Sequence, residues 1–167
     1  DGEGLKNISK DESSSGRTLT AKTDLTIYDN TSGKLVPYAT LLKGKKMEII
    51  REYGSNWYRV EAAGRTGYVA KSDVTVSFQS KDRYFQVVTK ELPVYDNSSG
   101  RLVEIGALKQ NEIYVRVRDY GNWHEIRFGS NVAYVRKADT LPAISSRPKN
   151  ENKGQYGVAQ RTVVAQT

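Results

Sequence analysis

One motif decides the fold because it occurs twice, as Tyr-Asp-Asn-Thr-Ser-Gly-Lys-Leu-Val at residues 28–36 and as Tyr-Asp-Asn-Ser-Ser-Gly-Arg-Leu-Val at residues 95–103. The offset between the two copies is 67 residues (95 − 28). After Ser55, which has no counterpart, the offset falls to 66 (123 − 57) and the agreement resumes at Trp57 and Trp123. A slip of one residue inside a turn, with matching sequence on both sides, indicates two copies of one folded module.

Length and composition agree with two small modules. The chain has 167 residues and no cysteine, so the cores of modules of roughly 55–65 residues must form without disulfides or thiolate metal sites. Lys and Arg total 26 against 19 Asp and Glu, a net charge of +7. Such an excess favours polyanionic partners. Because acidic residues interrupt the basic ones, we interpret most of this charge as ordinary surface, and we predict no nucleic-acid partner.

The pattern of short apolar runs predicts an all-β fold. Residues 47–53 are predicted to form one strand, and in the second copy Ile113, Val115 and Val117 alternate with Tyr114, Arg116 and Arg118. Turns recur every 8–12 residues and no segment has a sustained helical period, which is typical of a small barrel or sandwich. We therefore predict two small, strongly bent β-barrels in tandem.

The modules are predicted at residues 17–74 and 84–140, with polar linkers at 1–16, 75–83 and 141–160. Phe78 in the middle linker is a candidate docking residue. Residues 161–167 match residues 17–23 at four of seven positions, so a third repeat is predicted to begin there and the chain to be part of a longer protein.

The modules resemble the bacterial type of Src-homology-3-like domain. The first copy carries the typical Leu-Leu-Lys-Gly, Trp-Tyr-Arg-Val and Gly-Arg-Thr-Gly-Tyr-Val segments at residues 41–44, 57–60 and 64–69. The second retains Trp-His-Glu-Ile at 123–126 and Ala-Tyr-Val at 133–135, but it replaces Lys43-Gly44 by Gln110-Asn111. The resemblance implies small β-barrels that occur in tandem in exported cell-wall hydrolases and polysaccharide-modifying enzymes, where they are thought to target peptidoglycan.

Catalytic chemistry finds little support in the sequence. His124 is the single histidine and stands where the first copy has Tyr58, so a structural role is expected for it. Without cysteine, and with one histidine, Cys–His catalysis and histidine-rich zinc sites are excluded. We predict that this segment is not an enzyme and has no cofactor or metal, although a longer protein could carry a separate catalytic domain. No stretch approaches the ~20 apolar residues of a membrane helix.

Aromatic residues form the candidate ligand-binding site. If Val60 and Val69 point inward, strand alternation places Trp57 and Tyr68 on the outer face. The candidates are Trp57 with Tyr68, Trp123 with Tyr134, and, beside the repeated turn, Tyr28 and Tyr95. Such rings suit sugar faces or extended peptides. Packing over a loop or between modules is the structural alternative.

The leading hypothesis is a non-catalytic, extracellular, cell-wall-associated module that binds peptidoglycan through its glycan or its stem peptide. The alternative is a spacer or protein-interaction module without wall affinity. A third hypothesis is binding of anionic wall polymers through Lys43, Lys45, Lys46 and Arg65.

Overall fold

The structure is a computed structural model, and it describes residues 13–152. Its backbone contacts divide the chain into two compact units, Asp1–Ser77 and Phe78–Thr167, each of which is considered by itself. The third repeat predicted at 161–167 and all but the last four residues of the linker predicted at 1–16 lie outside the described residues.

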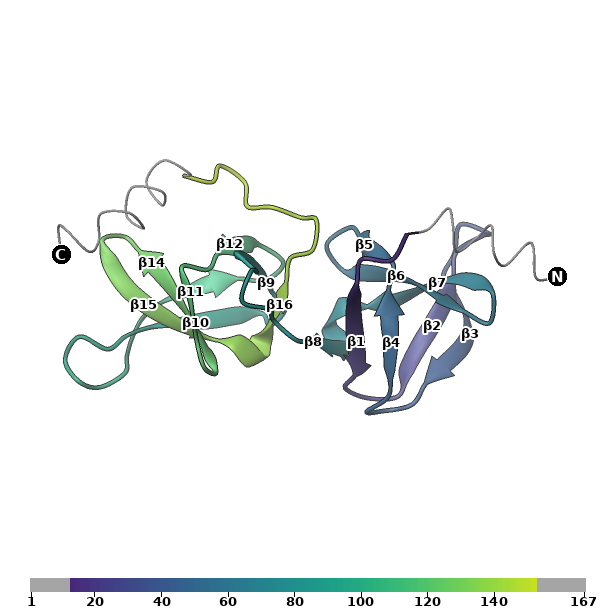
Figure 1. Cartoon of the computed structure of the whole chain (residues 1–167), viewed down its shortest axis with the longest axis horizontal. Coiled ribbons are helices and arrows are strands. Elements are labelled where there is room, and N and C mark those ends of the chain that lie inside the picture. The colour runs from purple at the N-terminus through teal and green to yellow at the C-terminus, as the bar shows by residue number, and fades with distance from the viewer. Residues whose placement is uncertain (1–12, 153–167) are drawn as a thin grey trace. The chain divides into compact units, whose positions relative to one another are not determined.

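The described part of each unit consists of strands and one short 3₁₀ turn (Figure 1). The first unit has, in order, β1 (Arg17–Ala21), β2 (Leu25–Asp29), β3 (Val36–Leu41), β4 (Lys46–Ile49), β5 (Arg51–Tyr53), β6 (Trp57–Ala62), β7 (Arg65–Ala70), η1 (Lys71–Asp73) and β8 (Val74–Val76). The second has β9 (Tyr84–Val87), β10 (Glu91–Asp96), β11 (Val103–Lys109), β12 (Ile113–Val115), β13 (Arg118–Tyr120), β14 (Trp123–Phe128), β15 (Asn131–Arg136), η2 (Lys137–Asp139) and β16 (Thr140–Pro142).

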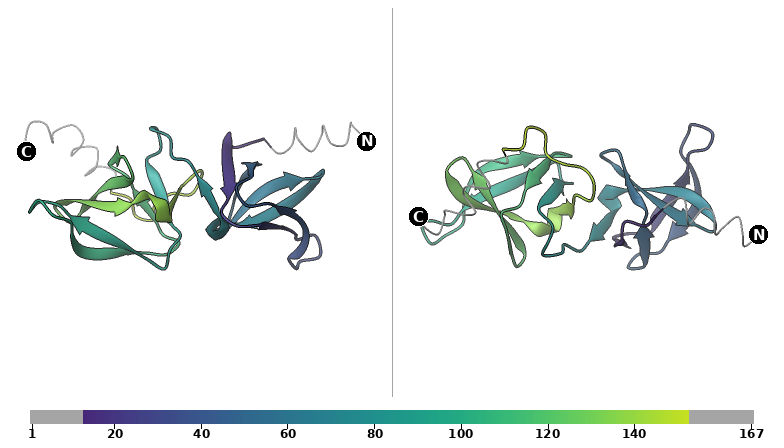
Figure 2. Two further views of the ribbon diagram at one scale, coloured as in Figure 1. Left: turned by 90° about the horizontal axis from the view of Figure 1, so that it is seen from below. Right: turned by 45° about the horizontal axis from the view of Figure 1, so that its top comes forward.

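Both units pair their strands in the same order. The first has a five-stranded sheet, β3-β2-β7-β6-β5, and a three-stranded sheet, β4-β1-β8; the second has β11-β10-β15-β14-β13 and β12-β9-β16. All pairings are antiparallel. Figure 2 shows the sheets of each unit from two further sides. The prediction of an all-β chain is confirmed, and the repeated sequence folds into repeated topology.

The strand predicted at residues 47–53 is wrong, because the chain changes sheet in its middle. β4 ends at Ile49 in the three-stranded sheet and β5 begins at Arg51 in the five-stranded sheet. Ile50 lies between them, and its N–H donates to the Arg59 carbonyl at 2.9 Å. The switch lets one segment serve both sheets, and it resets the alternation of inward and outward side chains.

The same switch in the second unit corrects the predicted place of Arg116. Alternation put it on the outer face, yet only 3% of it is exposed. Its Nε donates to the Asp82 carbonyl at 2.9 Å, and its terminal nitrogens to the Gln79 carbonyl at 2.7 Å and to Asp119 at 3.0 Å. The segment predicted as the middle linker is therefore held against the second unit. Phe78 also docks there, with its ring 4.5 Å from that of His124.

Each unit has its own apolar core between its two sheets. Leu19, Leu25, Ile27, Ile49, Tyr58, Val60 and Val69 are buried in the first unit. Phe85, Val87, Leu92, Val94, Leu108, Ile126, Ala133 and Val135 form the core cluster of the second. Trp57 and Trp123 are not among these residues, so the cores form without them.

The two cores fill one equivalent space differently. In the second unit a Cβ added at Gly106 would lie 2.7 Å from Phe128 Cζ, so the Phe128 ring depends on this glycine. The repeat aligns Gly106 with Ala39 and Phe128 with Ala62. A small residue facing a large one in the second unit thus corresponds to two alanines in the first.

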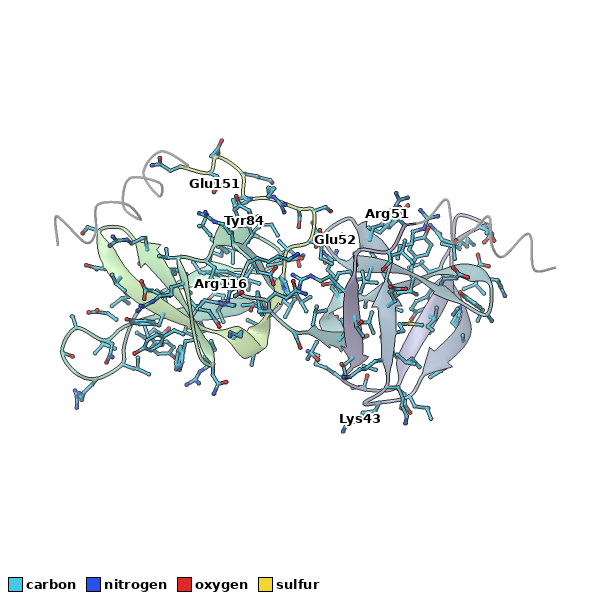
Figure 3. All side chains as sticks on the ribbon, viewed as in Figure 1. Lys43, Arg51, Glu52, Tyr84, Arg116 and Glu151 are labelled. Carbon is cyan, nitrogen blue, oxygen red and sulfur yellow. The ribbon has the colours of Figure 1, made fainter. Side chains whose placement is uncertain are left out.

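The segment after Asp139 packs against the second unit. β16 extends to Pro142, two residues into the predicted linker, and Ala143 is buried. Further along, Arg147 lies over the Tyr84 ring at 4.9 Å, and the Tyr84 hydroxyl donates to Glu151 at 3.0 Å (Figure 3). Burial and this hydrogen bond raise the pKa of Tyr84.

Candidate functional site

An aromatic patch covers part of the outer face of the five-stranded sheet in the first unit. Trp57 on β6 and Tyr28 on β2 make an edge-to-face pair, with ring centroids 5.7 Å apart and planes at 88°. Tyr68 on β7 packs against Tyr53 on β5 at 4.8 Å. The pairs adjoin, because Tyr28 faces Tyr68 and Tyr53 faces Trp57 in the strand register. We call Tyr28, Tyr53, Trp57 and Tyr68 the first aromatic patch.

The second unit repeats this arrangement. Tyr95 and Trp123 are 5.7 Å apart with planes at 89°, and Tyr120 and Tyr134 are 5.4 Å apart. We call Tyr95, Tyr120, Trp123 and Tyr134 the second aromatic patch. Equal ring geometry in two copies of diverged sequence indicates that the same contacts are retained in both.

The structure brings together the six aromatic residues predicted for the site, three in each unit, but pairs them differently. Trp57 contacts Tyr28 and not Tyr68, and Trp123 likewise contacts Tyr95. Sequence reasoning missed Tyr53 and Tyr120, which are 46% and 53% exposed. Both stand two residues after an arginine in the aligned copies, and that shared position was the available signal.

Strand alternation explains why these rings face outward. Tyr58 and Val60 on β6 are buried, as is Val69 on β7, whereas Trp57 and Tyr68 remain partly exposed. Burial strongly raises the pKa of Tyr58. The inward prediction for Tyr58 is confirmed.

His124 occupies the position of Tyr58 in the second unit and is completely buried. Its ring stacks on Phe85 at 4.6 Å, and its Nε2 lies 2.9 Å from the Thr140 hydroxyl. Because that hydroxyl donates to the Lys137 carbonyl, it accepts the proton of Nε2. Burial, with Arg116 and Lys137 nearby, lowers the pKa of His124 to about 3. The imidazole is therefore a neutral part of the core at physiological pH, as a structural role requires.

The two indoles have different neighbours. On β15, Arg136 faces Trp123 and its guanidinium carbon lies 4.5 Å from the ring centroid. On β7, Ala70 faces Trp57. A guanidinium over an indole is an attractive cation–π contact. The second indole is therefore partly covered by a cation that the first lacks at this position.

A cavity of about 300 Å³ adjoins the second aromatic patch and shares Tyr134 with it. Its other lining residues are Asp96, Asn97, Ser98, Ser130, Asn131 and Val132. The amides, hydroxyls and carboxylate offer hydrogen-bond donors and acceptors, while Tyr134 offers a ring edge. This combination suits a polar ligand with an apolar face, such as a sugar.

In the first unit the position of Asn131 is taken by Arg65, which changes the equivalent region. Arg65 makes an ion pair with Asp29 and lies over the Tyr38 ring at 4.1 Å. Hydrogen bonds from Thr31 and Arg65 lower the pKa of Asp29 to about 2. Arg65 is thus engaged within its own unit, which weakens its predicted role in binding anionic polymers. Lys43, Lys45 and Lys46 are exposed.

Between residues 13 and 152, no group of three or more His, Cys, Asp or Glu side chains is placed to hold a metal ion. Over the same residues, no helix has the length and apolar character needed to cross a membrane.

Comparison with known proteins supports the first unit's resemblance. Residues 37–75 match the family described as bacterial SH3 domain, which confirms the Src-homology-3-like character predicted from the sequence. A search of curated proteins gave no match.

Two solved structures are similar to the chain at low identity. They are NlpC2 and NlpC1 from Trichomonas vaginalis, at 13% and 14% identity, with TM-scores of 0.28 and 0.29. The matches cover 90% and 88% of this chain, which spans 57% and 54% of those two proteins.

Proposed function

We propose that this chain is a non-catalytic, cell-wall-targeting segment of a longer exported enzyme, and that its two aromatic patches bind peptidoglycan through the glycan or the stem peptide. In this proposal residues 17–74 and 84–140 are two Src-homology-3-like barrels in tandem, and the protein acts outside the cell. The bacterial SH3 match over residues 37–75 supports the class.

One observation carries the proposal: the same outward-facing aromatic arrangement occurs in both units, with the Trp–Tyr pair at 5.7 Å in each. The apolar cores contain neither tryptophan, so folding alone gives little reason to retain them. Tyrosine and tryptophan present apolar area together with a polar tip, which suits sugar rings and peptide backbones. Two weak sites on one chain also gain affinity through effective concentration.

Sedimentation of the whole chain with purified cell walls tests this proposal. We expect Trp57→Ala and Trp123→Ala each to weaken binding by about 5- to 150-fold, the usual range for an aromatic contact residue. The double variant should lose almost all binding. Leu42→Ala is the matched control, because Leu42 is 60% exposed and lies outside both patches, and it should bind as the parent does.

Thermal unfolding of each variant separates contact from folding. The proposal expects the tryptophan variants to remain folded at the temperature of the binding assay. If they sediment normally while folded, the patches are not the binding surface. A parent protein that stays in the supernatant at every concentration would instead favour the spacer.

A further inference from the structure

The charges beside the two aromatic patches differ in a way that the shared fold does not require. On the outer face of the first unit, Arg51 on β5 faces Arg59 on β6. At the equivalent place in the second unit, Arg118 faces Glu125. That second pair is a salt bridge, with Arg118 Nε and a terminal nitrogen 3.1 and 2.9 Å from one Glu125 oxygen.

The exchange of charge is confined to one strand. Residues 59–61 read Arg-Val-Glu, and the aligned residues 125–127 read Glu-Ile-Arg. The net charge of the strand is the same in both copies, but its order is reversed. Because same-face positions on a strand are about 6–7 Å apart, Glu61 lies one such step further from the level of Arg51.

The cations of the first unit border its aromatic patch. Arg59 faces Tyr68 across β7, and Arg51 lies on the same face of β5 as Tyr53. Arg51 is exposed, near the surface shown in Figure 3. Like charges placed directly opposite on neighbouring strands are unfavourable in the absence of a counter-ion. A ligand anion between Arg51 and Arg59 would relieve that repulsion, and planar guanidinium groups suit carboxylate and phosphate geometry.

We propose that the first aromatic patch, together with Arg51 and Arg59, selects an anionic carbohydrate polymer, a sugar or polyol chain that carries phosphodiester or carboxylate groups. The second patch is neutralised at the same place by the Arg118–Glu125 pair and takes uncharged segments. The inference rests on the proposed function, because it assumes that both patches contact wall polymers. It moves anion recognition from Lys43, Lys45, Lys46 and Arg65 to the outer face of β5 and β6.

The chain has two tryptophans, one in each patch, so their indole N–H signals in a nuclear magnetic resonance spectrum report the patches separately. The whole chain is titrated with poly(glycerol phosphate) oligomers, with oligogalacturonate and with uncharged chitohexaose. We expect both anionic probes to shift the Trp57 signal at concentrations about tenfold lower than the Trp123 signal. Rising salt should weaken this response steeply. The phosphate and carboxylate arms identify which anion is preferred.

Charge exchange supplies the decisive variants. Arg59→Glu should abolish the preference at Trp57, and Arg59→Glu with Glu125→Arg should transfer it to Trp123. Arg59→Gln gives the same test without a new charge if the glutamate variant does not fold. Lys43→Glu is the control for total charge, because Lys43 and Arg51 lie at opposite ends of the first unit (Figure 3). It should leave the preference unchanged.

Equal response of both tryptophans to the anionic probes, or an Arg59→Glu variant that keeps the parent preference, would overturn the inference. Tighter binding of a single-stranded oligonucleotide than of either anionic carbohydrate would overturn the assignment to carbohydrate. A soluble disaccharide–peptide fragment of peptidoglycan separates this inference from the proposed function. If the fragment shifts neither signal while the anionic probes shift Trp57 alone, peptidoglycan binding fails and anion selectivity stands.

Discussion

Replacement of Gly106 by Ala tests whether the second core depends on the close approach of Phe128. The new Cβ would lie 2.7 Å from Phe128 Cζ and 2.9 Å from its Cε2, whereas carbon atoms in good contact are about 3.5–4.0 Å apart. Overpacking of this kind typically costs 1–3 kcal/mol. We expect Gly106→Ala to lower the free energy of unfolding by about 2 kcal/mol, a fall in Tm of roughly 8–16 °C for a unit of this size.

Removal of the ring should remove that penalty. In a Phe128→Ala background, Gly106→Ala reproduces the two alanines that the first unit has at Ala39 and Ala62. The second substitution should then cost nothing or stabilise slightly, because alanine has less freedom than glycine in the unfolded chain. The expected coupling energy between the two sites is about 2 kcal/mol.

Denaturant unfolding of the whole chain measures this coupling. A Trp57→Phe background leaves Trp123 as the single tryptophan, so its fluorescence follows the second unit alone. If Gly106→Ala costs the same with and without the Phe128 ring, within about 0.5 kcal/mol, the steric argument is refuted.

Two further predictions concern backbone and pH. Ala63 has φ = 54°, and the aligned residue is Gly129 with φ = 64°. Ala63→Gly should therefore stabilise the first unit by about 0.5–1 kcal/mol in thermal or denaturant unfolding, and a loss of stability would contradict this. His124 has a pKa of about 3 when folded and about 6.5 when unfolded, so the unfolded state binds more protons between these values. Stability of the second unit should fall as pH drops from about 6.5 toward 3, and His124→Phe should reduce that slope; equal slopes from pH 7 to pH 4 would disprove it.

The sequence was sufficient to predict the class of fold and the outward face of the site. Period-2 alternation around Val60 correctly placed Tyr58 inside and Trp57 outside. The repeat strengthened this prediction, because it required the same arrangement at Trp123. The bacterial SH3 match then confirmed the family resemblance over residues 37–75.

The failures share one physical cause. Alternation describes a side chain relative to its own sheet, and it cannot tell which of two sheets a strand joins. At Ile50 the chain passes from one sheet to the other, so the single predicted strand became two. Arg116 stands at the equivalent junction, where it turns inward to three hydrogen-bond acceptors.

Partners across strands were also beyond a linear reading. Tyr53 joins the patch because the hairpin register sets it opposite Trp57, and that register depends on the turn. The contrast between the Arg51–Arg59 and Arg118–Glu125 pairs is visible only once β5 is paired with β6 and β13 with β14.

The unequal filling of the two cores bears on how a chain with an internal repeat reaches the right fold. Near-identical neighbours can exchange strands while folding, and such misassembly is a characteristic failure of repeat proteins. An exchange that set Ala39 against Phe128 would create a clash, and one that set Gly106 against Ala62 would leave a void. Each mismatch penalises the hybrid and spares both native units. Divergence between the copies therefore helps each half of the chain to find its own strands.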